Sequence, residues 1–455
     1  MHKALWTLIN FIIFFSVAGI AQNKTLENSQ MLQYQIQNYL QNLNADPCEV
    51  TLIDMQQGLD SIQWDDYPNE VLLKESPSLI FGLFQLRLAL HQKLPTFSAQ
   101  CAAKARIIFH QLRNHEDFLG SFAYLVQDLD PLKLDFQTQP VPILNREAYP
   151  KYLAKAELIA APFQFQNGDV MIARGVSFFS AIITQISDNQ SHFSHTLVVH
   201  KSNDEIQTIE SYVGKGMGAY ELDFALKNEN VRLMVLRPKD SALAEKAATV
   251  AMDAAAKKLP YDYEMNFDDD QQMSCVEVPT YAYKIASDGT LKIPKYPAQL
   301  NLKNEDFLMR LGLKNGELIT PDDLETDPRF ELVLDWKDAR LVRDSRQKDA
   351  VLFEIIRRVN DENYKFQPTI KSFFVTQVLL PLRQTFLWNL IKNISGVPQI
   401  DAHIPPLTLE VMTQLDQVAT KLLSELKKQD DAYQATKGRV MTNMQLREVV
   451  KNLKI

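Results

Sequence analysis

The spacing of apolar residues changes twice along the chain, and this change restricts the possible folds more than any other feature. Up to about residue 140 apolar side chains recur at helical spacing, as in residues 76–94 and 97–126. From Gly168 short strand-like runs follow, and from about Asp338 helical spacing returns. This order predicts an α+β core with a small antiparallel sheet and packed helices, flanked by N- and C-terminal all-helical regions. The runs that predict strands are residues 169–174, 195–200, 206–211 and 231–238.

The length of 455 residues predicts two or three hydrophobic cores. We expect a helical N-terminal domain at residues 22–145, a mixed domain at 146–335 and a helical region at 336–455. Ser76 or Ser78 is the expected cap of the helix at 76–94, and Ser98 of the next. Within the mixed domain we expect helices at 177–187 and 240–258, and another that begins near Cys275.

The first 21 residues have the parts of a secretory signal peptide. A basic start with Lys3 precedes an apolar run at residues 5–17, and the small residues Gly19 and Ala21 follow. The run is shorter than the roughly 20 residues that a membrane-spanning helix needs. We therefore expect cleavage after Ala21 and a secreted or periplasmic protein, with an uncleaved anchor as the alternative.

A second apolar stretch lies at residues 373–391. Polar residues and Pro381 interrupt it, which favours a buried or amphipathic kinked helix over a stable membrane span. The formal charge of −8 is spread along the chain without a basic stripe. A nucleic-acid partner is therefore not expected.

Three cysteines are present, Cys48, Cys101 and Cys275. Export would place them in an oxidising compartment, where paired cysteines tend to be bridged. Cys48 and Cys101 both lie in the N-terminal helical region, and a disulfide between them would stabilise the fold by roughly 4 kcal/mol in the chain-entropy model. Cys275 is then the odd thiol, either a buried apolar residue or a reactive group.

Cys275 precedes a predicted helix, where unpaired N–H groups and the helix dipole favour a thiolate and can bind an oxyanion. His195 begins a predicted strand and is the expected proton acceptor. Glu210, at the end of the neighbouring strand, could accept a hydrogen bond from the imidazole. These three residues are the predicted catalytic group.

The residues around this group have less specific roles. Tyr261, Tyr263 and Ser274 are candidates for the substrate-binding surface, and the two tyrosines are equally compatible with core positions. The acids at 268–270 lack the glycine and the twelfth-position Glu of a calcium-binding EF-hand loop. No metal and no organic cofactor is expected.

An ordered set of motifs resembles the circularly permuted papain-like cysteine amidases, the YiiX-like branch of the NlpC-type cell-wall peptidases. The resemblance covers roughly residues 160–290. It departs from the family at Val276, where a small polar residue is usual, and at Ser274, where an aromatic one is common. The motifs are Gly168-Asp169, residues 177–187, Ser194-His195, Ile209-Glu210, Leu236-Arg237, Tyr261-Asp262 and Cys275-Val276-Glu277.

The resemblance implies a permuted papain-like catalytic domain at 146–335 and a secreted cysteine hydrolase. It would cleave amide bonds in peptides, with peptidoglycan fragments as the expected substrates. One alternative is an acyltransferase or lipid hydrolase of the lecithin retinol acyltransferase-like type. The other is a non-catalytic binding or scaffold protein with a retired active site.

Overall fold

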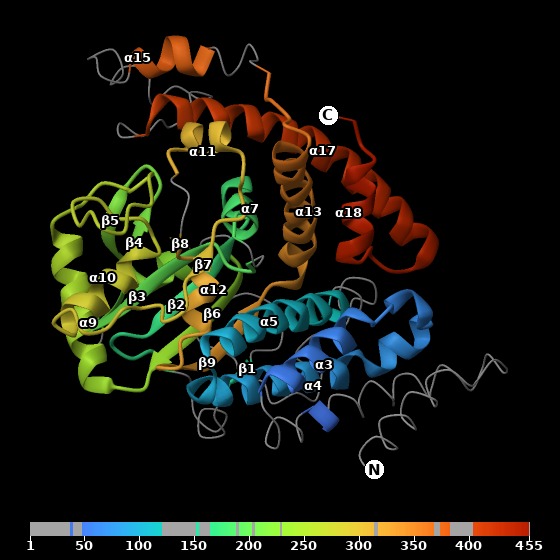
Figure 1. The fold of residues 1–455 in the computed structure, drawn as a ribbon, viewed down its shortest axis with the longest axis horizontal. Coiled ribbons are helices and arrows are strands. Elements are labelled where there is room, and N and C mark those ends of the chain that lie inside the picture. The colour runs from blue at the N-terminus through green and yellow to red at the C-terminus, as the bar shows by residue number, and fades with distance from the viewer. Residues whose placement is uncertain are drawn as a thin grey trace.

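A computed structural model describes residues 37–39, 48–120, 152–153, 164–187, 191–202, 205–227, 230–313, 317–367, 374–382 and 404–454. The predicted signal peptide at residues 1–21 lies outside the described residues. Figure 1 shows a sheet with N-terminal helices beside one of its edges and C-terminal helices across one end.

The main sheet has seven antiparallel strands in the order β1-β9-β6-β2-β3-β4-β5. The four predicted strands are confirmed as β2, β3, β4 and β6, so the α+β class is confirmed as well. A separate small sheet pairs β7 (Ala298–Gln299) with β8 (Glu317–Leu318). The seven strands of the main sheet are β1 (Tyr152–Leu153), β2 (Val170–Gly175), β3 (His195–Ser202), β4 (Glu205–Tyr212), β5 (Gly216–Glu221), β6 (Asn230–Pro238) and β9 (Phe330–Lys337).

Helices α9 (Ser241–Ala256) and α10 (Glu277–Ala286) pack against each other and against one face of the sheet. Alternation along β3 explains this, because Val198 faces the core that these helices share. Leu197 and Val199 face the opposite side, in a separate cluster that includes Trp336. The start of α10 is thereby placed beside β3.

The N-terminal helices are α3 (Cys48–Asp60), α4 (Asn69–Lys93) and α5 (Ala99–Gly120). The predicted cap at Ser76 or Ser78 is wrong, because α4 begins at Asn69 and continues through Pro77. Burial of Leu72 and Leu79 on both sides of the proline supports the longer helix. The apolar side chains of these helices belong to the same hydrophobic cluster as α9, α10 and one face of the sheet.

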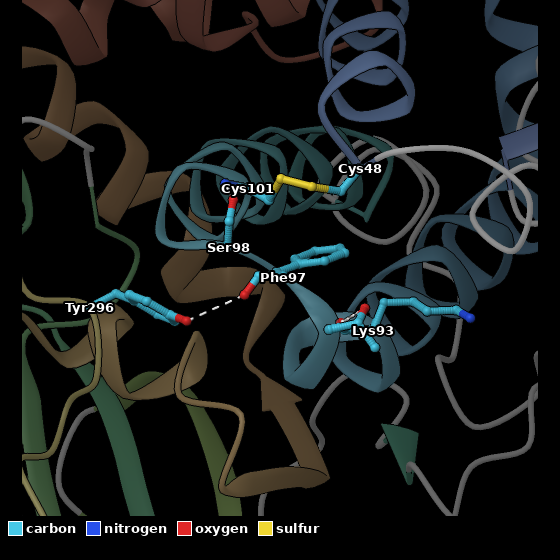
Figure 2. Close-up of a disulfide and its surroundings, with 7 residues drawn as sticks. Cys48, Lys93, Phe97, Ser98, Cys101 and Tyr296 are labelled. Atoms are coloured by element: carbon cyan, nitrogen blue, oxygen red, sulfur yellow. Dashed lines mark hydrogen bonds between the residues drawn. A yellow bond between two sulfur atoms is a disulfide. The ribbon is translucent and has the colours of Figure 1, made fainter.

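A disulfide joins Cys48, at the start of α3, to Cys101 in the first turn of α5 (Figure 2). The Ser98 hydroxyl accepts a hydrogen bond from the Cys101 backbone N–H at 3.2 Å, as expected of a cap. In the same view the Tyr296 hydroxyl donates to the Phe97 carbonyl at 3.5 Å. This contact joins the N-terminal helices to the segment before β7.

The C-terminal part contains α13 (Ala339–Asp361), α17 (Pro406–Lys437) and α18 (Asn443–Lys451). With α7 (Phe178–Gln185) and α11 (Glu305–Leu311) they form a second hydrophobic cluster. The remaining short elements are α8 (Leu222–Lys227), α12 (Pro321–Glu325), the π-helix Phe374–Leu379 and α15 (Leu380–Leu382). Within the described ranges no helix is both long and apolar enough to cross a membrane.

Candidate active site

Cys275 lies in the turn that leads into α10 and is 4% exposed. Its carbonyl accepts a hydrogen bond from the Thr196 hydroxyl of β3 at 2.5 Å and another from the Val278 backbone N–H at 3.3 Å. Pro279 is tolerated in the first turn of α10, where its missing N–H costs no hydrogen bond. The thiol is therefore held between the first turn of a helix and the start of a strand.

His195 is the first residue of β3, and its Nε2 lies 2.8 Å from Oε2 of Glu210. The ring also hydrogen-bonds Cys275, which leaves Nδ1 as the nitrogen that faces the thiol. Burial lowers the pKa of His195, but the hydrogen bonds and charges of Cys275 and Glu210 outweigh this and raise it to about 10. The site thus favours an imidazolium beside the sulfur.

Glu210 comes from β4 and is 0% exposed. Its second oxygen, Oε1, accepts a hydrogen bond from the Thr208 hydroxyl at 2.8 Å. Thr208 and Glu210 share one face of the strand because alternate residues point the same way. Both oxygens are therefore engaged, and the carboxylate orients the His195 ring.

Tyr212 continues the same face of β4 and was not predicted as a site residue. Its ring stacks on His195 with centroids 5.0 Å apart and an interplanar angle of 23°. Phe224 and Lys215 surround Tyr212 on its other sides. The sequence signal that could have identified Tyr212 is its spacing of two residues from Glu210, because alternate residues of a strand lie on the same face.

These residues line a cleft of about 440 Å³. Among the described residues that line it there is no Arg or Lys, and Glu210 is the only carboxylate. Much of the wall is apolar, with small uncharged polar side chains at one side. The apolar residues include Val176, Phe179, Ile183, Leu197, Val213 and Ala225, and the polar ones include Ser177, Ser180 and Asn230.

Of the predicted substrate-binding residues, Tyr261 lines the cleft. Tyr263 and Ser274 are buried outside the lining, because Tyr263 packs on Tyr261 within an apolar cluster and the Ser274 backbone is bonded to Glu277. The cleft lining therefore includes one of the three.

The other histidines near the sheet have structural positions. His192 is buried against His110 and shares a hydrogen bond of 3.1 Å with Asn114. Burial lowers the pKa of His192 well below its usual range. In the part of the chain that the structure describes, no three His, Cys, Asp or Glu side chains form a group that could hold a metal ion.

The fold and the site define a papain-like cysteine hydrolase in which the cysteine follows the histidine and glutamate in sequence. Residues 164–334 match the model of the family described as permuted papain-like amidase enzymes, YaeF/YiiX, C92 family. This part of the chain is similar to that family, and the match supports a hydrolase of the cysteine amidase class. The match favours the enzyme over the non-catalytic alternative.

A solved structure is also similar to this chain, that of the metalloprotein yiiX from Escherichia coli O157:H7. It is 19% identical in sequence, with a TM-score of 0.31, and the comparison covers 38% of this chain and 97% of that one. No curated protein matches the chain.

Proposed function

We propose that the protein hydrolyses amide bonds through a Cys275–His195–Glu210 triad. The observation that carries the proposal is the position of the His195 ring, which bonds Glu210 through Nε2 and faces Cys275 with its other nitrogen. Such an arrangement keeps the thiolate and the imidazolium together before substrate binds. Glu210 fixes the orientation of the ring and stabilises its cation.

In the proposed reaction the Cys275 thiolate attacks the substrate carbonyl and forms a tetrahedral intermediate. Backbone N–H groups at the start of α10 stabilise the oxyanion, and His195 donates its proton to the leaving amine. Water then attacks the acyl-enzyme with His195 as the base. The thiolate is regenerated as the acid product leaves.

The proposed substrates are cell-wall peptides outside the cytoplasm. The apolar stretch at residues 5–17 supports export. The Cys48–Cys101 disulfide agrees with an oxidising compartment. The absence of Arg and Lys from the described cleft lining indicates that the acyl part of the bound substrate is uncharged near the scissile bond.

A second candidate is hydrolysis or transfer of a lipid acyl group, and the apolar wall of the cleft favours it. Phe179, Ile183 and Leu197 could surround an alkyl chain next to Cys275. The acyl-enzyme would be the same, and water, an alcohol or an amine would resolve it.

The test compares the wild type with Cys275→Ala on wall peptides, on N-acyl amides and on phospholipid. The proposed function requires that amide cleavage falls by at least about 10³-fold in Cys275→Ala, and undiminished cleavage would contradict it. Faster turnover of phospholipid than of either amide would establish the second candidate.

Alkylation by iodoacetamide gives a control that does not need the substrate. We expect Cys275 to react rapidly at pH 6 in the wild type and more slowly in His195→Ala, because the imidazolium stabilises the thiolate. His200→Ala is the matched control, since His200 lies on the same strand with its side chain on the opposite face. Equal rates in all three proteins would exclude the ion pair.

A further inference from the structure

Two buried carboxyl groups, of Asp262 and Glu277, hydrogen-bond each other next to the nucleophile. Asp262 is 0% exposed and Glu277 is 5% exposed. Asp262 follows Tyr261, which lines the cleft, and Glu277 lies two residues after Cys275. The pair therefore joins a cleft-lining loop to the turn that carries the nucleophile.

Each carboxyl group also organises the backbone of its own segment. Glu277 Oε2 accepts from the Ser274 N–H at 2.6 Å, directly before Cys275. Asp262 accepts from the Glu264 N–H at 2.8 Å and from the Asn266 N–H at 2.6 Å. Movement of either carboxyl would thus displace backbone that borders the thiol.

The charges around the pair favour a proton between the two groups. Among the described residues no Arg or Lys forms an ion pair with either carboxyl, and two buried carboxylates in contact repel each other. No positively charged group is in direct contact with Asp262 or Glu277. The neighbouring groups on the cleft loop are the phenols of Tyr261 and Tyr263 and the carboxyl of Glu264. The neighbouring group on the nucleophile turn is Cys275, and the His195 imidazole lies behind it.

We propose that Asp262 and Glu277 share one proton and act as positioning residues, so that loss of this proton separates the cleft loop from the nucleophile turn and lowers activity. The inference rests on the proposed function, since it takes Cys275 as the nucleophile. Neither carboxyl contacts the reacting atoms.

The direction of the pKa shifts agrees with this arrangement. Burial raises the pKa of Glu277, the bonds from Ser274 oppose this, and the neighbouring Asp262 adds to it, so that the value reaches about 8. Burial also raises the pKa of Asp262. Because the pKa of His195 is raised to about 10, the pair loses its proton at lower pH than the catalytic histidine does.

The first experiment measures kcat against pH for the wild type and Glu277→Gln, each relative to its own value at pH 6.5. The Gln amide can donate to Asp262 and its oxygen can still accept from Ser274, and it does not ionise. We expect the wild type to lose activity with a midpoint near pH 8 and Glu277→Gln to lose it more than one pH unit higher. Asp270→Asn, at an exposed site on the same loop, is the matched control and should retain the wild-type midpoint.

An identical alkaline midpoint in the wild type and Glu277→Gln would overturn the proposal while leaving the triad intact. A second measurement does not depend on turnover. The infrared difference spectrum between Cys275→Ala and Cys275→Ala/Glu277→Gln should contain a protonated carboxyl band that disappears between pH 6 and pH 10. The subtraction removes other buried carboxyls, such as Asp323, whose pKa burial raises to about 7. A difference spectrum without this band would contradict proton sharing whether or not Cys275 is the nucleophile.

Discussion

At the level of single residues, the contacts with Cys275 and Glu210 distinguish His195 from an ordinary buried imidazole. Burial alone would lower the pKa of His195, as it does for His110, where the value falls to about 3. The contacts of His195 with Cys275 and Glu210 reverse the direction. Two histidines of similar burial thus differ in charge because of the partners that each one has.

This reasoning predicts the result of Glu210→Gln. The Gln oxygen can still accept from Nε2, but the loss of the negative charge lowers the pKa of His195. We expect kcat/KM at pH 7 to fall by about 10²-fold. In the Glu277→Gln background, where the Asp262–Glu277 pair no longer limits activity at high pH, we expect the alkaline limb to move to lower pH. Glu205→Gln, an exposed site on the same strand, is the control for steady-state kinetics across pH. An alkaline limb at the same pH in Glu277→Gln and in Glu210→Gln/Glu277→Gln would contradict the role of the Glu210 charge.

At the scale of elements, the structure includes two well-formed strands that the sequence pattern did not predict. β5 contains Gly216 and Gly218 and pairs with β4 at the edge of the sheet. β9 pairs with β6 over most of its length. Glycines weaken the local preference for a strand, and pairing with a neighbour compensates for this.

The contact between β3 and the start of α10 gives a prediction at this scale. Thr196 is buried, and Thr196→Val removes the donor to the Cys275 carbonyl at nearly constant volume. We expect the free energy of unfolding to fall by about 1–2 kcal/mol and kcat to fall as well, because a buried carbonyl loses a partner. Urea unfolding and kinetics would measure the two effects. Thr249→Val, at an exposed site on α9, is the control and should change neither the free energy of unfolding nor kcat. If Thr196→Val had the same stability and kcat as this control, the contact between Thr196 and Cys275 would not matter for either property.

At the scale of the whole molecule, the N-terminal helices are joined to the catalytic sheet by buried charge as well as by apolar packing. Arg87 of α4 is 0% exposed and bonds Glu116 of α5 at 3.0 Å and Asp335 of β9. Lys337 of β9 also approaches Glu116, at 3.6 Å. One network therefore connects two helices of the flank with an inner strand of the sheet.

Arg87→Leu tests whether the flank and the sheet unfold together. The change leaves two buried carboxyls without their guanidinium, so we expect the free energy of unfolding to fall by about 3–5 kcal/mol. Far-UV circular dichroism and intrinsic fluorescence should report one common transition in the wild type. Lys74→Leu, at an exposed site on the same helix, is the matched control. Stability equal to that of the control would show that the network does not connect the two parts.

The α+β class and four of the seven main strands follow from the period of apolar residues along the chain. The candidate triad was predicted from a cysteine ahead of a helix together with the resemblance to the permuted papain-like amidases. Only the folded chain shows which nitrogen of His195 faces Glu210, that Tyr212 stacks on the ring, and that Asp262 contacts Glu277. It also shows that the N-terminal helices share a core with the sheet. These features depend on contacts between segments far apart in the chain, and the local pattern of a sequence carries no record of such contacts.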